Sequence, residues 1–325
     1  MIVLERESSN KMIMLEILMR RLDEEDMDYE YFRNQYKTIK YGYEGEMHVD
    51  REWEEIIIPS KYYLFHNFET ENEVKHSHQI DTIFASQNFI LLLEIKNIGG
   101  RIDFDQKKHQ FMRTRLDGTK DGYSNPVDQI ERHVRFFKRI FMKWEIALPI
   151  EYAIILTQPS TVIGDTPNNA AIFHVSGLQT YVYNLFAKYQ KNQISPHKLE
   201  ILKNYLLAIR KRKIWDPKID KNKLRKGVLC KACNYKSVMR FEHGNFICPM
   251  CKAKNKDALY EALYDYRHLH SEWITNYDLR NYLNIGSRFA VKRLVSNLNL
   301  EYEGIRKDRK YRIPDNILTF IEKRT

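Results

Sequence analysis

The spacing of apolar and polar residues divides the first part of the chain into helices and strands. Residues 9–40 carry apolar side chains three or four positions apart, which predicts one or two helices, and residues 42–54 read as another helix. Short runs rich in aromatic and β-branched residues predict three strands, at residues 62–69, 79–85 and 89–97. The third run is apolar from Phe89 to Leu93, so we expect a central strand that is buried on both faces.

A capped helix and two further strands are predicted next. Asn125 caps a helix that has Pro126 at its first position and runs to about Trp144. Strands are expected at residues 152–157 and 171–175, with helices from Ser176 and over residues 196–213. Residues 101–124 are polar and contain Asp-Gly turn signals, so we expect a turn-rich connection there.

Two acids and a lysine lie around the turn between the second and third predicted strands. If Gln87-Asn88 is a two-residue turn, counting outward sets Asp81 directly opposite Glu94. Such pairs have β-carbons about 4.5–5.5 Å apart, and like charges at that distance are destabilising unless a cation lies between them. A divalent metal with oxygen ligands is the simplest such cation. Lys96 lies two positions after Glu94 and therefore on the same face of the strand.

An acid and a lysine at the end of a strand can also be a solvated ion pair, which contributes only about 0–1 kcal/mol. The spacing Glu-x-Lys alone does not separate the two interpretations. The predicted burial of the strand favours a functional role, because unpaired charges are seldom retained at the end of a buried element.

The order helix, three strands, helix, strand resembles the restriction-endonuclease-like, or PD-(D/E)XK, nuclease core. Residues 41–157 in particular resemble the nuclease-related domain, the NERD family. The resemblance rests on Gly42-Tyr43-Glu44-Gly45-Glu46, Asp81, Glu94-Ile95-Lys96-Asn97, Gly100, and Asn125-Pro126 with Gln129. One position departs from the pattern, since Ile80 stands where the core has a proline before the first acid.

The resemblance implies an α/β fold with an α-β-β-β-α-β core and a metal-dependent phosphodiesterase activity. Asp81 and Glu94, with the main-chain carbonyl of Ile95, would then hold one or two Mg²⁺ or Mn²⁺ ions. Lys96 would orient the attacking water and stabilise the phosphoryl charge. Whether Lys96 also acts as a base depends on a lowered pKa, which a sequence does not reveal.

Other residues near the predicted strands and helices are further candidates. Glu46 would add a metal ligand from the first helix, with an ordinary surface acid as the equal alternative. Gln129 lies in the first turn of the second helix, and the resemblance implies that it contacts the phosphate or the attacking water; without the resemblance it reads as a surface residue. His76 and His78 precede the second strand, and such a H-x-H pair can bind zinc, although it is also common at strand edges. A phosphate contact of His78 near Asp81 is the less favoured interpretation.

All four cysteines of the chain fall into two C-x-x-C pairs, Cys230 with Cys233 and Cys248 with Cys251, separated by 14 residues. Each pair can point two thiolates at one ion, and two such pairs close a tetrahedral Zn²⁺ site. The segment between them reads as a small hairpin, so we predict a structural zinc ribbon. Two disulfides are the alternative, which conflicts with a cytosolic chain.

Charge is distributed unevenly along the 325 residues, whose net charge is +10. Residues 1–204 contain 26 Lys and Arg against 30 Asp and Glu, whereas residues 205–325 contain 27 against 13. The strongly basic second part is therefore the candidate to hold phosphates, with salt-sensitive binding.

The last segment resembles a winged helix. Residues 257–270 read as a helix, and two short helices around a turn at Ile285-Gly286-Ser287 precede a predicted β-hairpin wing. This arrangement usually binds DNA, and docking onto a protein is the alternative. The residues expected to contact nucleic acid lie on the second short helix and on the wing: Arg288, Lys292, Arg293, Arg306, Lys307, Arg309 and Lys310.

These observations predict five parts. They are N-terminal helices (1–40), a nuclease-like domain (41–190), a helical linker (191–225), a zinc ribbon (226–256) and a winged-helix-like segment (257–325). The predicted function is a metal-dependent nuclease acting on nucleic acid, with DNA favoured; the alternative is a non-catalytic DNA-binding or regulatory protein with a remnant nuclease fold. No signal peptide or membrane-length apolar run is present, so we expect a cytoplasmic protein without a membrane partner. The N-terminal helices allow a homodimer.

Overall fold

The structure is a computed structural model that describes residues 1–322, except for the side chains of Lys307, Ile321 and Glu322. Internal contacts divide the chain into two compact units. The first contains residues 1–10 and 37–214, and the second contains residues 11–36 together with the chain from Trp215 onward. No helix among the described residues is both long enough and apolar enough to cross a membrane.

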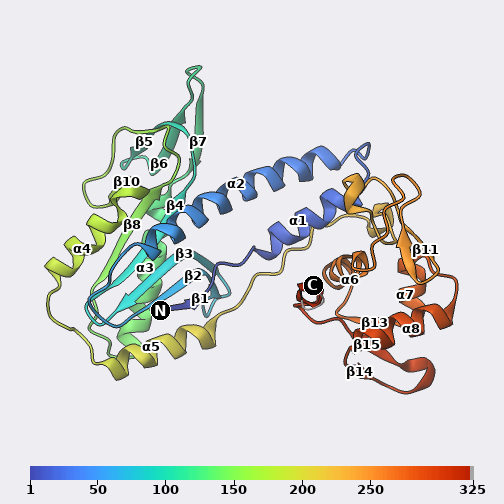
Figure 1. Cartoon of the computed structure of the whole chain (residues 1–325). Helices are drawn as coiled ribbons and strands as arrows, with labels where there is room; N and C mark the ends of the chain where they lie inside the picture. The colour runs from blue at the N-terminus through green and yellow to red at the C-terminus, as the bar shows by residue number, and fades with distance from the viewer. Residues whose placement is uncertain (323–325) are drawn as a thin grey trace. The chain divides into compact units, whose positions relative to one another are not determined.

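A six-stranded mixed sheet forms the centre of the first unit (Figure 1). Its strands, in spatial order, are β1 (Ile2–Leu4), β2 (Tyr62–Glu71), β3 (Ser77–Ser86), β4 (Ile90–Lys96), β8 (Ile150–Leu156) and β10 (Ala171–His174). The β2–β3 and β3–β4 pairs are antiparallel, and the other pairs are parallel. Strand β4 therefore lies inside the sheet, as its apolar run predicts.

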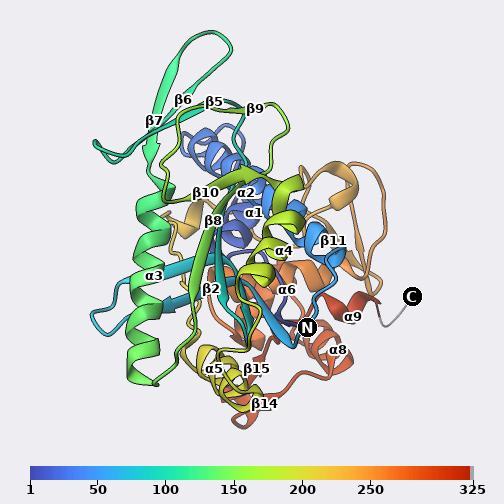
Figure 2. The same ribbon diagram turned by 90° about the vertical axis from the view of Figure 1, so that its left-hand side faces the viewer.

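Helices cover both faces of this sheet, which explains why the central strands are apolar on both sides. One core cluster joins β2, β3 and β4 to α3 (Pro126–Lys143) and α5 (Pro196–Ile209). The opposite cluster joins the same strands to α2 (Tyr29–Glu54) and α4 (Leu178–Lys188). Figure 2 shows α3 along one side of the sheet and α4 along the other. The predicted α/β class is thus confirmed.

The β3–β4 hairpin has the predicted register. The Ser86 N–H donates to the Phe89 carbonyl at 3.1 Å across the two-residue turn, and the pairing continues outward to Thr82 opposite Leu93. One further step along the same register sets Asp81 opposite Glu94. Both acids therefore emerge at the same end of two buried strands.

A second, four-stranded sheet corrects the expectation of a turn-rich connection at residues 101–124. It has the order β7 (Lys120–Ser124), β6 (Gln110–Thr114), β5 (Gly100–Asp105) and β9 (Thr161–Ile163). Ile102, Phe104 and Phe111 are buried and supply its small core. A few apolar residues among many polar ones suffice here, because only one face of the sheet is covered. The predicted Asp117-Gly118 turn is present, with Gly118 at φ +83°.

The second unit contains α1 (Asn10–Arg21), β11 (Arg240–Glu242), β12 (Asn245–Ile247), α6 (Ala258–Leu269), β13 (Trp273–Thr275), α7 (Asn276–Leu283), α8 (Arg288–Leu298), β14 (Tyr302–Glu303), β15 (Lys310–Arg312) and α9 (Thr319–Glu322). Strands β11 and β12 form the hairpin expected between the cysteine pairs. Strands β13, β15 and β14 form a three-stranded sheet. One hydrophobic cluster joins Cys230, Cys248 and Phe246 to α6, α7 and α8, so the predicted ribbon and C-terminal segment share a core.

Two adjacent arginines of α1 meet one buried acid of α6 in the second unit. Arg20 and Arg21 both bond Asp265, with Arg20 Nε 3.0 Å from Oδ1 and Arg21 Nε 2.6 Å from Oδ2. Arg21 also donates to the Arg225 carbonyl at 2.7 Å. Asp265 and Arg21 are each only 1% exposed. One buried carboxylate thus bonds two buried guanidinium groups, and the exposed Glu16 adds a longer contact of 3.5 Å to Arg20.

We expect Asp265→Ala to destabilise the second unit strongly, since among the described residues it leaves the buried Arg21 without a counter-charge and Arg20 with only the exposed Glu16, at 3.5 Å. Removing one partner of a buried ion pair typically costs about 3–5 kcal/mol. Urea denaturation of the full chain measures the change, with the exposed Asp308→Ala as the control, expected within about 0.5 kcal/mol of the parent. Equal stability of the two variants would contradict the role assigned to Asp265.

Two histidines form a buried pair in the first unit. His78 of β3 and His133 of α3 have their Nδ1 atoms 3.0 Å apart. They are 2% and 0% exposed, respectively. Burial is the main factor that lowers the pKa of His78 to about 4, helped by the positive charge of Arg132, and it lowers the pKa of His133 to about 3. Both rings are therefore neutral at pH 7.

This pair predicts a loss of stability in acid. Below about pH 6.5 the unfolded chain takes up protons that the folded rings do not, so stability falls as the pH falls through that value. Between pH 7 and pH 5 the wild type should lose on the order of 2–4 kcal/mol more than the His78→Asn/His133→Asn double variant. Urea denaturation of both proteins at the two pH values tests this. Parallel losses would show that the pair does not carry the effect.

Candidate active site and cysteine cluster

The predicted catalytic residues line one cavity of about 1150 Å³ in the first unit. Asp81 comes from β3, and Glu94 and Lys96 come from β4. Glu46 of α2 and Gln129 of α3 complete the set from the two flanking helices. Residues far apart in the sequence are therefore gathered at the end of the β3–β4 hairpin.

Glu94 is held by two of the other predicted residues. Lys96 Nζ lies 2.6 Å from its Oε1, and Gln129 Nε2 donates to its Oε2 at 2.9 Å. The start of α3 fixes Gln129 in place, because the Asn125 side chain accepts from the Val127 N–H at 3.0 Å and Pro126 occupies the first turn. The capped helix start thus sets the position of the Gln129 amide.

Asp81 is held by the main chain of the neighbouring strand. Its Oδ2 accepts from the Ile95 N–H at 2.7 Å. The Asp81 carbonyl oxygen in turn accepts from Arg6 Nη2 at 2.9 Å. Asp81 is 8% exposed and Glu94 is 1% exposed, so both acids are largely removed from water.

Arg6 is a site residue that the sequence analysis missed. It lies after β1, and its side chain is only 2% exposed. Its guanidinium bonds Glu46 at 2.6 Å and Asp50 at 2.6 Å. Asp50 also lies 3.0 Å from His66 Nδ1. No sequence signal could have found Arg6, because it reaches the site only after β1 pairs with β2.

The four-stranded sheet adds cations to the same cavity. Arg113 and Arg115 of the β6–β7 hairpin line it, together with Tyr123. Arg115 is held by Asp121 at 2.7 Å across the hairpin. These residues lie in the segment predicted to be turns, so their contribution to the site was also missed.

Burial and mutual repulsion keep the acids of the cavity partly protonated. Burial first, and then the charge of Asp81, raises the pKa of Glu46 to about 7 and that of Glu94 to about 8. Burial also raises the pKa of Asp81, despite the opposing effects of Lys96 and the Ile95 N–H. The acids therefore lack enough nearby positive charge to ionise fully.

Lys96 remains a cation. Burial alone would lower its pKa, but the neighbouring Glu94 and Asp81 outweigh that effect, and the net pKa is raised. An ammonium group with a raised pKa stabilises negative charge and orients polar groups. It is a poor base at neutral pH.

The donor set of the cavity fits Mg²⁺ or Mn²⁺. Carboxylates and a main-chain carbonyl are the hard oxygen ligands that these ions prefer, and a bound cation would oppose the effect of burial and of Asp81, which raises the pKa of Glu46 and Glu94. Among the described residues, only the four cysteines are gathered closely enough to hold a metal ion as they stand, and the oxygens of Glu46, Asp81 and Glu94 do not form such a group. Their present partners are the cations Arg6 and Lys96 and the donors Gln129 and Ile95.

The interpretation of His78 as a phosphate contact beside Asp81 is not supported. His78 does not line this cavity; it bonds His133 and lines a second cavity instead. The physical reason is the alternation of side chains along β3. His78 and Asp81 are three positions apart, so their side chains point to opposite faces of the sheet.

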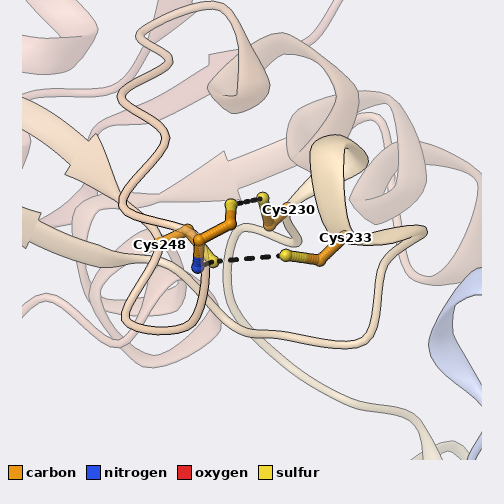
Figure 3. Close-up of side chains that lie close together, drawn as sticks. Cys230, Cys233 and Cys248 are labelled. Atoms are coloured by element: carbon orange, nitrogen blue, oxygen red, sulfur yellow. Dashed lines mark hydrogen bonds between the residues drawn. The ribbon is translucent and has the colours of Figure 1, made fainter.

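The four cysteines converge in the second unit. Their sulfur atoms all lie within 4.8 Å of one another, with Cys230 Sγ 3.7 Å from Cys251 Sγ and Cys233 Sγ 3.8 Å from Cys248 Sγ. Tetrahedral zinc with Zn–S bonds of about 2.3 Å sets its sulfurs about 3.8 Å apart. All four thiols are free, and Figure 3 shows Cys230, Cys233 and Cys248 facing one another. This geometry is compatible with a zinc ribbon and excludes the alternative of two disulfides in this structure.

The basic residues of the C-terminal segment lie on a helix and a hairpin, as the pattern predicts. Arg288, Lys292 and Arg293 are exposed on α8. Arg306 and Lys310 are exposed around the β14–β15 turn. Arg309 is half-buried, with its guanidinium 4.3 Å from the centre of the Tyr302 ring. The side chain of Lys307 lies outside the described residues. Their role as nucleic-acid contacts stays a prediction.

Comparisons with known proteins give a match for residues 41–157 of the chain. Neither the curated proteins nor the solved structures gave a significant match to this chain. A family model does match, that of the nuclease-related domain, NERD, over residues 41–157. This range contains Glu46, Asp81, Glu94, Lys96 and Gln129. The chain therefore carries, over residues 41–157, a nuclease-related domain of the NERD family.

Proposed function

We propose that the first unit is a metal-dependent nuclease that hydrolyses phosphodiester bonds of nucleic acid, with DNA the favoured substrate. The observation that carries this proposal is the grouping of Asp81, Glu94 and Lys96 in one cavity, with both acids buried. Buried acids that face a cavity and resist ionisation are typical of sites that work on a charged ligand.

Asp81, Glu94 and the Ile95 carbonyl would hold Mg²⁺ or Mn²⁺, with Glu46 as an additional ligand. When bound, the metal supplies a more acidic water and neutralises charge on the phosphoryl oxygens. The chain's own cations Lys96, Arg113 and Arg115 add positive charge to the cavity, but the raised pKa of Lys96 keeps this group protonated, so it does not activate a water as a base. The residues therefore fit a metal-assisted rather than a purely general-base mechanism.

Three residues position this donor set. Lys96 holds Glu94 through its ammonium group and presents positive charge to the cavity, where it stabilises the developing charge of the phosphoryl group. Gln129 fixes the other oxygen of Glu94. Arg6 holds Glu46 and the main chain at Asp81, so it ties α2 to β3. Such support keeps the ligands in one geometry.

The second unit would bind the nucleic acid. Its net positive charge, the exposed cations of α8 and the hairpin β14–β15 suit a winged helix on DNA. The four cysteines would hold one structural Zn²⁺, since four thiolates fill a tetrahedral site and leave no position for a substrate. Cysteines that form no disulfide also favour a reducing compartment, in keeping with a cytoplasmic location.

A substrate panel tests the activity. The full chain is incubated with Mg²⁺ or Mn²⁺ and with single- and double-stranded DNA and RNA, and Asp81→Asn and Lys96→Ala are run in parallel. We expect metal-dependent cleavage that each substitution lowers by at least about 100-fold, as for other groups that stabilise transition-state charge. The exposed Glu55→Gln and Lys191→Ala serve as charge-matched controls and should leave the rate unchanged.

Two outcomes would contradict parts of the proposal. Cleavage that survives both Asp81→Asn and Lys96→Ala would show that another site is responsible. No cleavage of any substrate, with tight and salt-dependent DNA binding retained, would favour a non-catalytic DNA-binding or regulatory protein with a remnant nuclease fold.

Metal analysis tests the zinc site. The purified chain should contain one zinc ion per molecule, and Cys248→Ser should lose it and unfold the second unit, because Cys248 is also part of its core. Met250→Ala, an exposed change between Cys248 and Cys251, is the control and should keep both zinc and fold. A zinc-free protein with a fully folded second unit would refute the ribbon.

A further inference from the structure

A second cavity of the first unit has no role in the chemistry described above. It measures about 680 Å³, within the roughly 300–1,000 Å³ range of small-ligand sites. It lies between α3, the β2–β3 turn and α5. Its lining residues include the cations of one face of α3, namely Arg132, Arg135, Arg139 and Lys143.

The charge of this cavity is positive and largely uncompensated. The four cations follow one another at intervals of three or four residues, so they form one stripe along the helix. Within the part of the chain that the structure describes, no carboxylate oxygen lies within 4.0 Å of Arg132, Arg139 or Lys143. Arg135 has only Glu131, at 3.8 Å. Of the two acids in the lining, Glu71 is paired with Lys211 at 2.5 Å.

The floor of the cavity is apolar and aromatic. Phe136 and Ile140 of α3 and Tyr205 and Ile209 of α5 line it. The His78 ring stacks on Phe136, with centroids 4.5 Å apart and planes at 24°. A ligand that fits both the stripe and the floor must carry negative charge and a flat, weakly polar face.

His78 adds a polar atom without a partner. The residue is 2% exposed, lines this cavity, and its Nε2 has no hydrogen-bond partner. Its Nδ1 faces Nδ1 of His133 at 3.0 Å, so one ring must donate to the other. If His133 donates, His78 carries its proton on Nε2 and becomes a donor for an anion. An unpaired buried donor is costly unless a ligand satisfies it.

We infer that this cavity holds one nucleotide unit of a nucleic-acid strand. The phosphate is bound by Arg132, Arg139 and the Nε2–H of His78. The base packs on the rings of Phe136 and Tyr205. Guanidinium groups with aromatic faces are the usual means by which proteins hold single strands. This inference rests on the proposed function for its choice of a nucleic-acid strand over a free nucleotide.

The two cavities are neighbours along α3 and β3, which supports a strand as the occupant. Gln129 and Gln79 line the first cavity, and Arg132 and His78 line the second. Gln129 and Arg132 are three residues apart on one helix, which is about 4.5 Å along its axis. Since Gln79 and His78 lie on opposite faces of the sheet, a strand that occupies both cavities would follow α3 from the cleavage site to the basic cavity.

Binding by paired variants tests the inference. The full chain carrying Asp81→Asn, which prevents cleavage, is titrated with fluorescent single-stranded oligonucleotides at several salt concentrations. Adding Arg132→Gln and Arg139→Gln should weaken binding about tenfold and reduce the salt slope by about one to two units. Lys138→Gln with Lys191→Gln removes the same charge from exposed positions outside the cavity and should change binding less than twofold.

Equal weakening by the two pairs of substitutions, or no weakening by either, would overturn the inference. A second arm uses AMP alone. If AMP saturates the parent and the Arg132→Gln/Arg139→Gln variant loses that binding while oligonucleotide binding is unchanged, the site takes a free nucleotide and the strand assignment is wrong.

The inference and the proposed function can fail separately. One outcome is that the Arg132→Gln/Arg139→Gln variant loses oligonucleotide binding while the wild type cleaves no substrate. That outcome would contradict the proposed nuclease activity and support the nucleotide site in the basic cavity. Cleavage that depends on Asp81, with an unchanged KM in the same double variant, would overturn the basic cavity alone.

Discussion

The structure of the first unit depends on one electrostatic constraint, the crowding of acids at the end of the β3–β4 hairpin. Asp81 and Glu94 lie opposite each other at the end of two buried strands, because the two-residue turn fixes the register of the hairpin. Glu46 joins them from α2, and burial raises the pKa of all three carboxyl groups. A folded chain can tolerate this only with positive charge close by. Arg6, Lys96, Gln129 and the Ile95 N–H supply such charge or hold an acid in place.

That constraint explains why the N-terminal segment belongs to the site. Strand β1 pairs in parallel with β2, and the chain that follows it brings Arg6 to Glu46, Asp50 and the main chain of β3. Arg6 lies outside residues 41–157, the range that matches the nuclease-related domain. The buried acids of the domain are thus completed by a cation from outside it. A guanidinium suits this position, because its planar fork bonds two carboxylates and a carbonyl at once.

The sequence predicted the parts of the fold that depend on the local pattern of apolar and polar residues. It did not predict the contacts that depend on tertiary packing. The apolar run before Glu94 identified β4, and the Gln87-Asn88 turn set the register that brings Asp81 opposite Glu94. The strands β5, β6 and β7 were missed because only a few buried residues mark them in a polar segment. Arg6 and the Arg21–Asp265 pair were missed for another reason, since partners 40 or more residues apart leave no periodic signal.

Helix α3 links the two cavities of the first unit, and its sequence shows how one element serves both. Its buried face, with Ile130, Val134 and Phe137, packs on the sheet and fixes the rotation of the helix. Given that rotation, the first turn must present Gln129 to Glu94, and the next turns must present Arg132 and Arg139 to the basic cavity. Three-residue and four-residue steps keep those side chains in one line. The packing that stabilises the helix therefore also sets the direction along which a bound strand would run, from the buried acids toward the exposed arginines.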